Sequence, residues 1–160
     1  MEETYKFPAL FTRNSRNSPY CTITNGRYRI TDTPLENSSY GYTIIEEALD
    51  NIIDRTRSLV KQDYCIEIPW RKKLLKIKAG TPVKIVEVKA SQIIFTKREG
   101  DEVSVNDVIA HTITGKSESR TVKSIFNGVI VFIGVHSFSN PETYVVAVAD
   151  SGSIEWYERG

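Results

Sequence analysis

The stretch Gly115-Lys116-Ser117 ends like a phosphate-binding loop, and a phosphate site is the first chemistry to test in this sequence. Such a loop requires G-x-x-x-x-G-K-[ST], because backbone amides must wrap the phosphates before a helix begins. Here Ala110 stands where the first glycine belongs, and the segment after Ser117 alternates like a strand. We therefore exclude a phosphate loop and place Lys116 in a turn between two strands.

The remaining residues with catalytic chemistry form no recognisable site. His111 and His136 are the only histidines, and neither H-x-x-x-H nor C-x-x-C occurs, so no compact metal site is expected. The G-x-S-x-G and G-x-G-x-x-G patterns are also absent. We expect a non-catalytic protein. The alternative is an enzyme whose site gathers the two histidines and the tyrosines from distant segments.

The bulk composition indicates a soluble globular chain. It has 160 residues, a formal net charge of +1 and two cysteines, Cys21 and Cys65, which we expect as buried thiols in a reducing compartment. No signal peptide or membrane-spanning run is visible, so a cytoplasmic location is predicted. The basic stretch 71–78 is interpreted as a solvated strand face, and the near-zero charge argues against nucleic acid as a partner.

The first part of the chain predicts a hairpin followed by a helix. Asn25-Gly26 lies between two alternating runs, which is the strongest short-range signal for a type I′ turn. Thr43 and Glu46 have capping-box spacing, and apolar residues then recur at helical intervals. We therefore expect one helix near 43–61, within a small α+β region covering residues 1–70.

From residue 71 onward the sequence predicts strands alone. Short alternating runs follow one another between glycine-containing turns, a pattern typical of a β-sandwich or small barrel. The composition changes near 69–73. We accordingly predict a mainly β protein with a second, all-β domain at 71–160.

Two corners are predicted in the stretch 99–110. Gly100-Asp101 should turn the chain into a short strand, and Asn106-Asp107 should turn it again. Val103 and Val105, between the corners, are expected to face the core. A strand from Val108 to Ile113 then leads to a hairpin near 115–118.

The block 99–133 resembles the biotinyl- and lipoyl-carrier domains, which share the barrel-sandwich hybrid fold. The similarity lies in a Gly-Asp-x-Val and Asp-x-Ile-Ala pattern and in the returning strand, carried by Gly100, Asp101, Val103, Asp107, Ile109, Ala110, Ser124, Gly128, Val129 and Ile133. The order of the whole chain is also similar to an archaeal family of uncharacterised proteins with a lipoyl-like C-terminal half.

The resemblance implies a barrel-sandwich hybrid for the second half and two functions. The leading one is a cofactor-free adaptor that docks a partner protein or a second copy of the chain. The alternative is a carrier with biotin or lipoate attached to Lys116 at the hairpin tip, beside Gly115. Carrier lysines usually lie in Met-Lys-Met or Asp-Lys-Ala contexts, whereas here the context is Gly-Lys-Ser.

Overall fold

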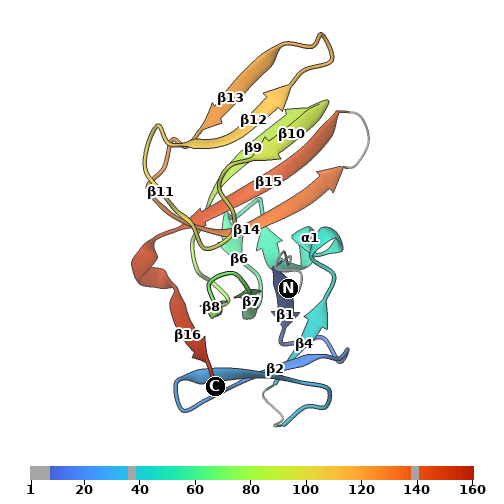
Figure 1. Ribbon diagram of the computed structural model, residues 1–160, viewed down its shortest axis with the longest axis vertical. Coiled ribbons are helices and arrows are strands. Elements are labelled where there is room, and N and C mark those ends of the chain that lie inside the picture. Colours follow the sequence, from blue (N-terminus) through green and yellow to red (C-terminus); the bar gives the residue numbers. More distant parts are fainter. Residues whose placement is uncertain (1–7, 36–38, 138–140) are drawn as a thin grey trace, which may run out of the picture.

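The computed structural model describes residues 8–35, 39–137 and 141–160, and it is mainly β (Figure 1). The first eight strands are β1 (Ala9–Thr12), β2 (Tyr20–Thr24), β3 (Arg27–Thr31), β4 (Tyr40–Thr43), β5 (Ile53–Asp54), β6 (Leu59–Val60), β7 (Tyr64–Ile68) and β8 (Lys73–Ile77). The others are β9 (Lys84–Ala90), β10 (Gln92–Phe95), β11 (Glu102–Val103), β12 (Val108–Ile113), β13 (Ser119–Lys123), β14 (Gly128–Ser137), β15 (Glu142–Ala149) and β16 (Glu155–Arg159). The helical turns are η1 (Ile45–Glu47), α1 (Leu49–Ile52) and η2 (Ser151–Ser153).

A closed barrel forms one end of the molecule, with strand order β1-β4-β2-β3-β16-β8-β7. Its β2–β3 hairpin turns at Asn25 and Gly26, whose φ angles of 55° and 77° are those a type I′ turn requires, so the hairpin prediction is confirmed. One buried cluster of the barrel consists of Phe11, Cys21, Tyr28, Tyr40, Cys65 and Leu74. Both cysteines are free thiols, as expected.

The barrel takes strands from both sides of the predicted boundary at residue 70. β8 pairs with β7, and β16 at the C-terminus runs back to pair with β8 and, in parallel, with β3 (Figure 1). The division into two domains stays a prediction.

The other end of the molecule consists of two sheets, β10-β12-β13 and β11-β14-β15-β9. A buried cluster draws on strands of both sheets, and its members are Val88, Val103, Ile109, Ala110, Ile130, Val146 and Val148. The run of strands predicted for this half is confirmed, because alternating apolar residues let each sheet bury one face.

The helix predicted for 43–61 is wrong. Only η1 and the single turn of α1 form, after which Ile53 continues as a strand and pairs with Val60. The Thr43 hydroxyl bonds to that of Thr12 (2.9 Å) and caps nothing. Asp54 Oδ1 accepts the amides of residues 56 and 57, which makes a turn where the helix would continue. Ile52 and Ile53 are β-branched, which lowers helix propensity and favours extended backbone. Both side chains are buried in the hydrophobic core that the two ends of the molecule share.

A third buried cluster joins the two ends of the molecule. It contains Leu10, Ile66 and Leu75 from the barrel together with Phe132 and Val145 from the long strands β14 and β15. This shared core holds the barrel against the two-sheet end of the molecule, and we call the region where they meet the junction. Among the described residues, no helix is long and apolar enough to cross a membrane.

Candidate functional site

Lys116 lies at the exposed tip of the β12–β13 hairpin. The Thr114 amide donates to the Glu118 carbonyl (2.9 Å), and Ser117 adopts a φ of 62° to close the turn that also contains Gly115. The Lys116 amide donates to Thr114 Oγ1 (3.3 Å). The hairpin is therefore where the sequence predicted it, and Lys116 is exposed; strands β12 and β13 lie at the end of the molecule away from the barrel (Figure 1).

Gly100 and Asp101 form a turn that packs on the barrel. Gly100 has a φ of 88°, which favours glycine, and a Cβ there would overlap Ile68 Cδ1 unless that side chain shifted. Its amide donates to the Ile130 carbonyl (2.7 Å), while Asp101 Oδ2 accepts from the Arg98 amide (2.7 Å). The first predicted corner is confirmed, and it lies at the junction rather than near Lys116.

The second corner, at Asn106 and Asp107, is the turn between strands β11 and β12. Asp107 Oδ2 accepts from the Ser104 amide (2.8 Å), and Asn106 has a φ of 79°. Val103 is buried, but Val105 lies in this turn and is 47% exposed, so the expectation that both valines face the core is wrong for Val105. Strand β11 ends at Val103, and the period-2 alternation ends with it.

Gly128 lets β14 approach β15 closely. A Cβ at this position would overlap the Ala149 carbonyl oxygen. Its role is therefore steric, and like Asp107 it is a structural residue of the second half.

The residue that sequence reasoning missed is Glu99, immediately before Gly100. It is only 3% exposed and lines a cavity of about 400 Å³, which we call the Glu99 pocket. The other lining residues are Pro8, Ile45, Glu46, Ile93, Phe95, Arg98, Ile133, Val135 and Tyr144. A glutamate beside a Gly-Asp turn is ordinarily solvated, so the sequence held no signal that this carboxyl is buried.

The Glu99 carboxylate is incompletely paired. Its Oε1 has no hydrogen-bond partner, and the Arg98 Nε lies 3.6 Å away, close enough for an ion pair only. An unmade hydrogen bond on a buried polar group costs about 1–3 kcal/mol, and more when the group is charged. A buried polar group without its hydrogen bond calls for an explanation, and a functional role is one such explanation.

Burial raises the pKa of the Glu99 carboxyl above its usual value of 4.5. The backbone amides of Glu99 and Ile133 and the Arg98 guanidinium favour the ionised form but offset only part of this rise. Burial together with the Glu99 carboxylate also keeps the pKa of Tyr64 well above its normal range. The Glu99 carboxylate therefore lines the pocket and also raises the pKa of Tyr64 in the shared core.

The walls of the Glu99 pocket are apolar and aromatic. Phe95 and Tyr144 meet edge to face, with ring centroids 5.3 Å apart. Exposed Glu46 stands at the rim and contributes, after burial and Glu142, to a raised pKa of Tyr144. The Arg98 guanidinium lies 5.8 Å from the centre of the Trp70 ring. The pocket thus combines a hydrocarbon lining with one buried carboxylate, a common arrangement in small-molecule sites.

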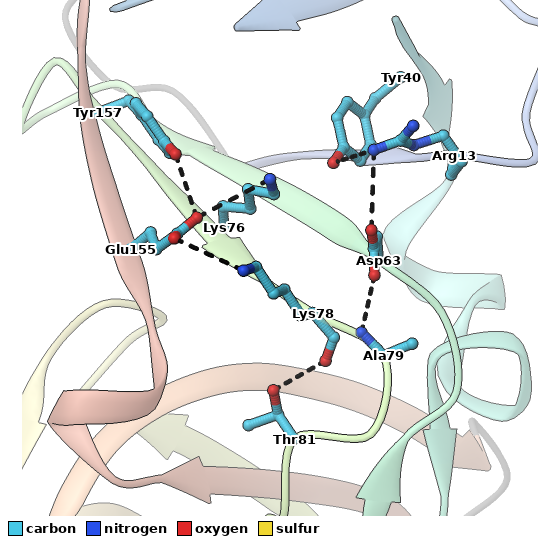
Figure 2. Close-up of polar contacts among 9 residues, drawn as sticks. All are labelled: Arg13, Tyr40, Asp63, Lys76, Lys78, Ala79, Thr81, Glu155 and Tyr157. Atoms are coloured by element: carbon cyan, nitrogen blue, oxygen red, sulfur yellow. Dashed lines mark hydrogen bonds and ion pairs between the residues drawn. The ribbon is translucent and has the colours of Figure 1, made fainter. Parts of the chain in front are cut away.

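A second polar region, on the barrel, has its charges paired. Figure 2 shows Glu155 between Lys76 and Lys78, at 3.8 and 3.9 Å, with the Tyr157 hydroxyl donating to the same carboxylate. These contacts link β16 to β8 and its continuation. We assign them a structural role.

The neighbouring cluster in Figure 2 consists of Arg13, Tyr40, Asp63 and Ala79. Arg13 Nη2 donates to the Tyr40 hydroxyl (2.7 Å) and lies 3.7 Å from Asp63, which accepts the Ala79 amide (2.8 Å). Arg13 Nε and Gln62 Oε1 also lack hydrogen bonds, but both residues are partly exposed, unlike Glu99. Glu99 therefore stands out in degree of burial.

The described part of the chain gathers no three His, Cys, Asp or Glu side chains able to hold a metal ion. Comparison with known proteins gives one family: the model described as "Uncharacterized protein conserved in archaea (DUF2118)" matches residues 5–151. No curated protein matches the chain.

Proposed function

The chain belongs to this archaeal family, DUF2118, and on that premise we propose that it is a non-catalytic module that binds a small organic ligand in the Glu99 pocket. The observation that carries the proposal is the Glu99 carboxyl, which is 3% exposed and lines a largely apolar cavity. A ligand that hydrogen-bonds to this carboxylate would offset the cost of burying it.

Binding rather than catalysis is supported by the lining of the pocket. Its described residues include no Ser, Cys or Lys nucleophile and no His, the commonest general base; Glu46, Glu99 and Tyr144 are the lining groups that could transfer a proton. The volume of about 400 Å³ lies in the range usual for small-ligand sites.

The test is an NMR titration with a neutral probe, benzyl alcohol. We expect amide shifts to concentrate at residues 93–99 and 133–135, and to saturate. Val135→Phe fills the pocket and should abolish these shifts. Val105→Phe makes the same change on an exposed turn and should leave them intact. Shifts scattered over the surface, or unchanged by Val135→Phe, would refute the proposal.

A second candidate function is a carrier modified on Lys116. It is favoured by one observation, the exposed lysine at the end of a hairpin in a two-sheet half. A barrel-sandwich hybrid of the lipoyl type would present its lysine in this manner, with the client enzymes as partner proteins. The cofactor-free adaptor, which docks a partner protein or a second copy of the chain, is a separate proposal from the carrier.

Intact-mass measurement of the protein from its native cells distinguishes this candidate. A mass increment matching biotin or lipoate, mapped to Lys116 and lost in Lys116→Arg, would support it. Arginine keeps the charge but cannot take the same acyl group. An unmodified native mass would leave the pocket as the functional centre.

A further inference from the structure

The residues that line the Glu99 pocket carry a net negative formal charge. Its lining holds two acids, Glu46 and Glu99, and one base, Arg98. That base is already engaged, because its guanidinium lies near the Trp70 ring and its Nε faces Glu99 at 3.6 Å without a hydrogen bond. The lining residues therefore carry a formal charge of −1, from two acids and one base.

The rest of the lining limits the kind of cation that fits. Mg²⁺ and Ca²⁺ require several oxygen ligands, whereas most of this lining is hydrocarbon. An anion would meet the Glu99 carboxylate directly. Aromatic side chains such as Phe95 and Tyr144 attract organic cations, and the four aliphatic lining side chains and Pro8 suit an apolar body.

We infer that the ligand is a primary amine with a hydrocarbon or aromatic body, bound with its ammonium group paired to the Glu99 carboxylate. This inference rests on the proposed function, since it names the class of ligand for the same pocket. The ammonium group offsets the formal charge of −1 in the lining and can donate a charge-assisted hydrogen bond to a carboxylate.

The experiment compares three probes of similar shape: benzylamine, benzyl alcohol and benzoate, titrated by NMR at low ionic strength. We expect benzylamine to bind about tenfold or more tightly than benzyl alcohol, because a hydrogen bond between charged groups is worth more than a neutral one. Benzoate should bind most weakly. Glu99→Gln should bring benzylamine close to benzyl alcohol, because it removes the charge and keeps a side chain of the same shape.

Glu102→Gln is the matched control, since it removes the same charge from an exposed position on β11 outside the Glu99 pocket. It should keep the preference for the amine. Equal binding of amine and alcohol to the wild type would overturn the inference and leave the proposed function standing, as would an amine preference that survives Glu99→Gln. Failure of all three probes to bind would overturn both.

Discussion

Arg71 and Asp101 join the barrel to the turn that carries Glu99. Arg71 Nη2 donates to Asp101 Oδ1 at 2.6 Å, and its Nη1 donates to the Gly100 carbonyl at 3.0 Å. Arg71 comes from the connection between β7 and β8, 30 residues before Asp101. This two-point contact holds the 98–101 turn against the barrel, and so fixes one wall of the Glu99 pocket.

Arg71→Ala should therefore loosen this turn. We expect a loss of about 1 kcal/mol in the free energy of unfolding. The two hydrogen bonds of Arg71 make the contact stronger than an ordinary surface ion pair, and the partial exposure of both side chains limits its value. Amide exchange should accelerate at Gly100. Arg57→Ala removes a long, exposed ion pair of 3.9 Å and should change stability by less than about 0.5 kcal/mol. Equal effects of the two variants in urea unfolding would contradict the assigned role.

Gly100→Ala should be more damaging than Gly80→Ala. Both glycines have a φ of 88°, so both variants incur the strain of a left-handed residue, about 1 kcal/mol. Only at Gly100 would the new methyl group overlap Ile68, whereas nothing lies within 4 Å of a Cβ at Gly80. We expect an additional loss of about 1–3 kcal/mol at Gly100 from overpacking. Similar melting temperatures for the two variants would show that the Ile68 side chain shifts to make room for the new methyl group at little cost.

Glu99→Gln should stabilise the protein in a pH-dependent manner. Because the folded pKa of Glu99 is raised above 4.5, the folded state holds this proton after the unfolded state has lost it. Wild-type stability therefore falls as the pH rises from 4.5 through the folded pKa, whereas the variant lacks this loss. We expect the variant to gain about 1–3 kcal/mol relative to wild type between pH 4 and pH 8.

Denaturant titrations at several pH values measure this gain. Glu102→Gln, on an exposed side chain, should run parallel to wild type over the same range. A constant difference between Glu99→Gln and wild type would mean that the folded pKa of Glu99 is normal.

Tyr64→Phe tests the shared core. The buried Tyr64 hydroxyl donates to the Val131 carbonyl at 2.8 Å, and its ring meets Phe132 edge to face at 6.1 Å. Removing the hydroxyl should cost about 1–2 kcal/mol while the ring contact remains. Tyr157→Phe, whose hydroxyl bonds to the partly exposed Glu155, should cost less. Two separate unfolding transitions in Tyr64→Phe would show that the two ends are held together by this bond.

The sequence predicted features that depend on neighbouring residues. Asn25-Gly26 makes its turn because these two residues tolerate positive φ, and the strands of the second half follow a period of two. The turns at Gly100-Asp101 and Asn106-Asp107 follow from the same local chemistry. For the 43–61 segment, helical spacing of apolar residues was misleading, because burial of Ile52, Ile53 and Val60 on one core favoured a turn and a short strand pair.

The sequence by itself determined the strands, their turns and the position of Lys116 on a hairpin, because each depends on local backbone preference. Only the tertiary structure decided that β16 completes the barrel and that Glu99 is buried. Both depend on contacts between residues far apart in the chain: β16 meets β3 more than 120 residues away, and Glu99 is enclosed by residues from Pro8 to Tyr144. Whether a carboxylate is solvated or buried depends on what covers it, and no local pattern contains that information.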